Sequence, residues 1–117
     1  MEDDTITAKA EQYKNFGNEE FKKQNYQAAI NHYSEAIELC PTEPAYFTNR
    51  AIAYLKIDKF DEAKGDCQQA LNINPNFAKA YNRLSKCLIA LGDLTAASIS
   101  LQKSIELDPK NEINKRD

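Results

Sequence analysis

The chain is poor in residues that interrupt helices and in residues that build metal or disulfide sites. Only 3 of its 117 residues are glycine and 4 are proline, and they form no linker, so we expect a single helical domain. The three cysteines, Cys40, Cys67 and Cys87, are an odd number at wide spacing. That pattern excludes a disulfide framework and a CxxC zinc site, and it predicts free thiols.

Long apolar runs and an excess of positive charge are also missing. No segment approaches the ~20 apolar residues that a membrane span needs, and the acidic first five residues are unlike a signal peptide. The net charge of -3 argues against a nucleic-acid or anionic-membrane surface. No phosphate loop, Ser/His/Asp arrangement or metal-ligand cluster occurs. We therefore expect a cytoplasmic, non-enzymatic protein without a cofactor or metal.

The chain does contain an internal repeat, in which similar residues recur every 34 positions. The recurring sets include Pro41, Pro75 and Pro109, then Ala29, Ala63 and Ala97, and also Tyr13, Phe47 and Tyr81. Within each copy, apolar residues recur at i+3 and i+4 on both sides of a short break, as in two amphipathic helices. The breaks fall at residues 23–25, 58–59 and 92–93, and each recurring proline ends a second helix.

The predicted fold class is therefore all-α, with three helix-turn-helix repeats at residues 10–43, 44–77 and 78–111. Residues 1–9 form a lead-in, and residues 112–117 form a C-terminal tail. Gly17, Ala51 and Ser85 share one position of the first helices, where a small side chain lets the paired helix approach closely. Cys67 and Cys87 are expected in the core, and Arg50 is expected to support packing or a salt bridge.

This period, with its aromatic, Gly/Ala, aromatic, Ala, Ala and Pro positions, resembles the tetratricopeptide-repeat (TPR) family. The resemblance implies a right-handed superhelix, an α-solenoid, whose first helices line a concave peptide groove. TPR arrays usually end in a capping helix, and residues 112–117 are too few for one. We therefore expect a truncated cap, an excised domain of a longer protein, or a cap supplied by a partner. A monomer is the expected state.

The first-helix residues expected to face the groove carry an uneven charge, six cations against the single anion Glu11. The cations are Lys14, Lys22, Lys56, Lys79, Arg83 and Lys86; the uncharged members include Thr48, Asn82 and Ala90. Cations gathered on one surface of an acidic chain repel one another, so the pattern indicates an anionic ligand.

Five of the groove residues resemble the dicarboxylate clamp of TPR co-chaperones. They are Lys14 and Asn18 in the first repeat, Asn49 in the second, and Lys79 and Arg83 in the third. The resemblance implies a grip on the terminal carboxylate and the Asp side chain of a peptide ending Glu-Glu-Val-Asp. Such peptides are the C-terminal tails of cytosolic heat shock proteins 70 and 90. Further groove-lining residues expected to hold the upstream part of the tail are Phe21, Ile52, Leu55, Lys56, Lys86 and Ile89.

The resemblance extends to the small glutamine-rich TPR protein, the TPR-containing J-protein and the Hsp-organising-protein groups. It implies a co-chaperone adaptor, and leaves open whether heat shock protein 70 or 90 is preferred. One alternative is a scaffold that holds an internal helical or acidic segment of a partner in the same groove. Another is a basic face that is merely solvated.

Overall fold

The computed structural model describes residues 2–110 as helices and the short connections between them. The helices are α1 (Glu2–Lys22), α2 (Tyr26–Leu39), α3 (Pro44–Lys56), α4 (Phe60–Ile73), α5 (Ala78–Ala90) and α6 (Leu94–Leu107). These residues contain no strand, and the helices form three successive pairs, so the predicted all-α class is confirmed. Each second helix ends two residues before a recurring proline, as expected for a residue that cannot continue a helix.

The first helix is longer than the repeat requires. It begins at Glu2, so the expected lead-in is helical over its described part and continues without a break into the first repeat. Residue 111, the expected end of the third repeat, lies outside the described residues. So does the tail at 112–117 with its expected truncated cap.

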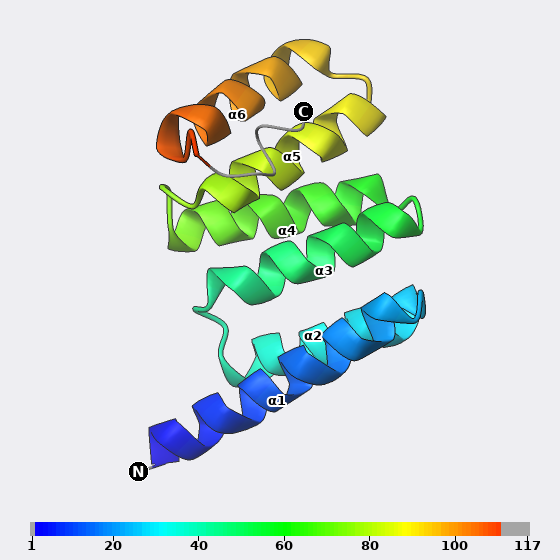
Figure 1. Ribbon diagram of the computed structural model, residues 1–117, viewed down its shortest axis with the longest axis vertical. Helices are drawn as coiled ribbons and strands as arrows, with labels where there is room; N and C mark the ends of the chain where they lie inside the picture. Colours follow the sequence, from blue (N-terminus) through cyan, green and yellow to red (C-terminus); the bar gives the residue numbers. More distant parts are fainter. Residues whose placement is uncertain (1, 111–117) are drawn as a thin grey trace.

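The helices follow one another along the long axis of the molecule, from α1 at one end to α6 at the other (Figure 1). Each helix packs against the next in the chain, and α3 also contacts α5. The first helices of the second and third repeats therefore lie near one another and form part of one face. Within residues 2–110, no helix combines the length and apolar character needed to cross a membrane.

The three turns inside the repeats have the same backbone geometry. Their left-handed residues are Gln24, Asp58 and Gly92, with φ of 66°, 61° and 86°. After each one, a backbone N–H donates to a carbonyl five residues earlier, as in Asn25 to Glu20 at 2.9 Å. This is the Schellman arrangement that ends a helix and satisfies its last carbonyl groups. The repeat thus terminates its first helices at the breaks predicted from the sequence.

Close packing within the first repeat depends on Gly17. A Cβ atom built on Gly17 would lie 2.5 Å from Cε1 of Tyr33, so the ring occupies the space that a larger side chain would fill. The prediction of a close helix approach at this position is confirmed. Cys67 and Cys87 are fully buried in one apolar cluster, as expected for core residues.

A buried ion pair joins three helices around the middle repeat. Arg50 of α3 donates from Nε and Nη2 to the two carboxylate oxygens of Asp66 on α4, at 2.8 and 2.7 Å. Its third nitrogen, Nη1, donates to the hydroxyl of Ser34 on α2 at 3.0 Å. The Asp66 side chain is only 8% exposed. Arg50 therefore has the structural role that the sequence suggested for it.

Candidate functional site

A cavity of about 760 Å³ opens on the face formed by the first helices. Most of its lining residues come from α1, α3 and α5, and only two come from second helices. They are Asn18, Phe21, Tyr33, Asn49, Ile52, Leu55, Lys56, Phe60, Arg83, Lys86 and Ala90. The cavity thus lies where the repeat pattern places the groove.

The cavity wall has a one-sided charge. Lys56, Arg83 and Lys86 are among its lining residues, whereas none of the described residues that line it is Asp or Glu. The chain as a whole has a net charge of -3, so the cavity has the opposite sign to its molecule. Such a concave, cationic surface raises the local concentration of anions.

The structure brings three of the five predicted clamp residues together in this cavity: Asn18, Asn49 and Arg83. Lys14 lines a neighbouring cavity with Glu11. Lys79 is exposed on α5, one turn before Arg83 and outside the lining set. Of the five predicted clamp residues, only Asn18, Asn49 and Arg83 therefore line this cavity.

Five of the six additional groove residues also line the cavity: Phe21, Ile52, Leu55, Lys56 and Lys86. Ile89, which is 55% exposed, does not line it, and its neighbour Ala90 does. One residue turns a helix by about 100°, which is enough to move a side chain off a face.

Two other residues expected to face the groove are buried. Thr48 and Asn82 occupy the position that Lys14 holds in the first repeat, and both are excluded from solvent. Asn82 nevertheless contacts the site, because its side-chain oxygen accepts a hydrogen bond from Nη1 of Arg83 at 3.0 Å. Asn82 therefore helps to orient the guanidinium from beneath.

Tyr33 also lines the cavity, although it is not among the site residues predicted from the sequence. Its ring is buried, at 2% exposure, and its hydroxyl donates a hydrogen bond to Oδ1 of Asn18 at 2.6 Å. Burial raises the pKa of Tyr33 to about 12, so the hydroxyl remains a donor at neutral pH. The other repeats carry Cys67 and Leu101 at this position. This difference between the repeats is the sequence signal that could have identified Tyr33 as a site residue.

Lys14 is held by a carboxylate of its own helix. Its Nζ lies 2.9 Å from Oε1 of Glu11, and Oε2 of Glu11 accepts a hydrogen bond from the hydroxyl of Tyr46 on α3. The hydrogen bond from Tyr46, and then that from Lys14, hold the pKa of Glu11 below its usual range. Glu11 is therefore ionised at neutral pH.

Among the described residues, no group of three or more His, Cys, Asp and Glu side chains is placed so that it could hold a metal ion. The cavity is lined by amide, ammonium and guanidinium donors together with apolar side chains. Such donors recognise carboxylates.

Comparisons with known proteins agree with this architecture. Family models described as TPR repeat and tetratricopeptide repeat match residues 17–58, 44–77 and 78–111. The Small glutamine-rich tetratricopeptide repeat-containing protein 2 of Mycosarcoma maydis is 45% identical over 97% of this chain. The DnaJ homolog subfamily C member 7 of Mus musculus is 38% identical over 95% of it. The chain spans only 32% and 22% of these two relatives.

Solved structures show the same arrangement of helices. The first TPR of Spaghetti (RPAP3), bound to the HSP90 peptide SRMEEVD, has a TM-score of 0.89 and 34% identity, covering 94% of this chain and 87% of its own. The second TPR domain of human RPAP3, in complex with the HSP70 peptide SGPTIEEVD, has a TM-score of 0.87 and 32% identity, covering 95% and 92%. With its three matched repeats and six helices, the chain belongs to the tetratricopeptide-repeat family.

Proposed function

We propose that this domain is a cytoplasmic co-chaperone adaptor that binds the acidic C-terminal tails of heat shock proteins 70 and 90. The observation that carries the proposal is the cavity wall, in which Asn18, Asn49 and Arg83 meet two lysines and no carboxylate among the described lining residues. A tail ending in Asp presents a terminal carboxylate and a side-chain carboxylate a few ångströms apart. The cavity offers donors to both.

The three kinds of donor have different tasks. Arg83 supplies a planar fork that fits a carboxylate with two hydrogen bonds, and lysines supply point charge. Asn18 and Asn49 supply directed N–H groups without adding repulsive charge. In Asn18 the oxygen accepts from Tyr33, so its amide nitrogen is the end that serves a ligand.

The apolar floor complements the charged rim. Phe21, Ile52 and Leu55 line the same cavity as the donors, and they suit the valine and the residues before it in a Glu-Glu-Val-Asp tail. The peptides bound to the related RPAP3 domains both end in EEVD. We transfer that ligand class to this chain because its cavity combines cationic and apolar lining residues.

Calorimetry with a free-acid peptide ending Glu-Glu-Val-Asp, beside its C-terminally amidated twin, tests the proposal. The free acid should bind with micromolar affinity, roughly -8 kcal/mol, because its footprint is small. The amide should bind far more weakly, and added salt should weaken the free acid.

Single substitutions of the clamp should reproduce the effect of amidation. Lys79→Ala and Arg83→Ala should each cost about 2 kcal/mol of binding free energy, since each removes a charged partner of a carboxylate. Lys103→Ala is the matched control, because Lys103 is an exposed lysine on α6, a second helix. Unchanged binding in both variants would contradict the proposed clamp.

The same titrations separate the adaptor from the scaffold alternative. Equal binding of acid and amide would indicate a groove that accepts an internal segment and ignores the terminus. Binding of neither would discard the co-chaperone function and leave only the repeat fold.

Removing the Tyr33 hydroxyl should weaken tail binding without removing the ring. Tyr33→Phe is expected to lower affinity for the free acid about 3- to 10-fold, the value of one hydrogen bond that orients the Asn18 amide. Phe60→Leu is a control on the apolar wall and should affect acid and amide peptides alike. A Tyr33→Phe variant that binds the free acid as the wild type does would show that Asn18 needs no such support.

A further inference from the structure

One position of the groove carries opposite charges in the first and third repeats. Glu11 and Lys79 stand two repeats apart at the same place in the 34-residue pattern, with Ala45 between them. The third repeat therefore presents a cation where the first presents a carboxylate. Helix formation by itself does not require an acid here, since alanine and lysine stand at this position in the other two first helices.

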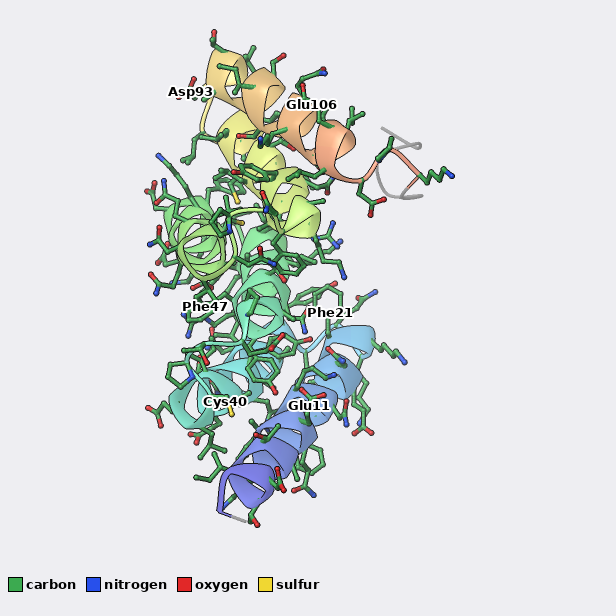
Figure 2. All side chains as sticks on the ribbon, turned by 90° about the vertical axis from the view of Figure 1, so that its left-hand side faces the viewer. Glu11, Phe21, Cys40, Phe47, Asp93 and Glu106 are labelled. Atoms are coloured by element: carbon green, nitrogen blue, oxygen red, sulfur yellow. The ribbon has the colours of Figure 1, made fainter. Side chains whose placement is uncertain are left out.

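Contacts from two helices fix the position of this carboxylate. One oxygen of Glu11 lies 2.9 Å from Nζ of Lys14, and the other accepts from the buried hydroxyl of Tyr46 on α3. Figure 2 shows Glu11 and Phe21 on α1, the helix that the first repeat contributes to the groove. Glu11 is thus anchored beside Lys14 by the fold.

We propose that Glu11 competes with a bound tail for Lys14. In the empty groove the carboxylate of Glu11 pairs with Lys14, and the terminal carboxylate of a bound tail engages the same lysine. This inference rests on the proposed function and adds a residue that sets the strength of tail binding. Lys14 has three N–H donors, so a tail shares the lysine with Glu11 instead of displacing it fully. The shared geometry brings two carboxylates close together, and their repulsion weakens binding.

The sign of the effect follows from the two carboxylates that Lys14 draws together. A fixed negative charge next to an anionic ligand raises the free energy of the complex, and removing that charge lowers it. The effect is largest for the ligand group nearest Lys14. A free-acid tail should therefore feel Glu11 more strongly than its amidated twin does.

Glu11→Gln is the informative variant, because glutamine keeps the shape and retains an oxygen that accepts from Lys14 or Tyr46. Calorimetry should show that this variant binds the free-acid Glu-Glu-Val-Asp peptide about 2- to 5-fold tighter than the wild type, a gain typical of one partly exposed charge. Glu43→Gln is the matched control, since Glu43 lines the same second cavity as Glu11 and has no ion pair with Lys14 among those in the described residues. It should change affinity less than about 2-fold.

A Lys14→Ala background tests whether the effect passes through Lys14. There the gain from Glu11→Gln should fall below about 2-fold, because the lysine for which acid and tail compete is gone. A carbon-13 NMR titration of the Glu11 carboxyl group, without peptide, gives a second readout. Lys14→Ala should raise the pKa of that carboxyl toward its usual range.

The outcomes separate this inference from the function on which it rests. Wild-type protein that binds the free acid selectively, with no gain in Glu11→Gln, overturns the inference alone. A full gain that persists in Lys14→Ala, or a Glu11 pKa that Lys14→Ala leaves unchanged, also overturns it. Wild-type protein that binds neither peptide overturns the proposed function and this inference together.

Discussion

Replacing Asp66 with alanine is expected to lower the free energy of unfolding by about 3 kcal/mol or more. Asp66 accepts two hydrogen bonds from Arg50, and little of either side chain reaches solvent, with 20% exposure for Arg50 and 8% for Asp66. Without the carboxylate, the guanidinium keeps its hydrogen bond to the hydroxyl of Ser34. A partly buried cation without its counter-ion is then the main cost.

A double-mutant cycle distinguishes loss of the pair from loss of packing. Arg50→Met and Asp66→Leu should each destabilise strongly, because each leaves one uncompensated charge in the interior. The double variant should be less destabilised than the sum of the two singles, since no buried charge is left. Urea denaturation followed by circular dichroism measures all four proteins.

Asp61→Ala is the matched control for Asp66→Ala. Asp61 lies in the first turn of the same helix and is exposed, so its loss removes only a favourable interaction with the helix dipole, less than about 1 kcal/mol. If Asp66→Ala is no more destabilising than Asp61→Ala, the ion pair does not hold the middle repeat to its neighbours.

The boundaries of the helices could be predicted because local chemistry determines them. Pro41 lacks the N–H and the freedom in φ that a helix needs, and Gly92 readily takes the left-handed conformation that ends one. Such signals act within a few residues; the proline recurs in every copy, whereas Gln24 and Asp58 take the place of Gly92 in the other two. Except for the early start of α1 at Glu2, the helices observed between residues 2 and 110 therefore begin and end where the sequence pattern places them.

The residues that line the cavity could be predicted only approximately, because the exact rotation of each helix about its axis was unknown. The stripe through Phe21, Ile52 and Leu55 lines the wall, since these residues lie well inside the face. At the end of α5 the wall passes through Ala90 instead of Ile89. Which of two neighbouring residues faces inward depends on how α5 crosses α3, and crossing angles arise from packing between helices.

The polar contacts between helices at the site could not be predicted, because each joins side chains that are distant in sequence. Tyr33 reaches Asn18 across 15 positions, and Tyr46 reaches Glu11 across 35. A repeat pattern tells which positions are near one another on average. It does not tell which hydroxyl meets which acceptor, since that depends on the rotamers of both side chains and on what surrounds them.

Gly17→Ala should destabilise the domain by about 2 to 3 kcal/mol, the cost of forcing an extra methyl group into a packed site. In an exposed helix interior the same change is stabilising, by up to about 1 kcal/mol. Here the new Cβ would lie 2.5 Å from Cε1 and 2.7 Å from Cδ1 of Tyr33. The ring cannot easily move away, because it is buried and its hydroxyl is bonded to Asn18.

Gly65→Ala is the matched control on α4, where nothing lies within 4 Å of the added Cβ. This variant should gain up to about 1 kcal/mol from helix propensity, so the two Gly→Ala changes should have opposite signs. Urea denaturation measures both, and calorimetry with the free-acid peptide adds a second comparison. Any shift of the Tyr33 ring in the Gly17→Ala variant also disturbs Asn18. The tail affinity of Gly17→Ala should therefore fall, while the tail affinity of Gly65→Ala stays unchanged. Equal stability of the two variants would mean that Tyr33 yields freely to the methyl group, and that the glycine beside Asn18 has no role in forming the groove.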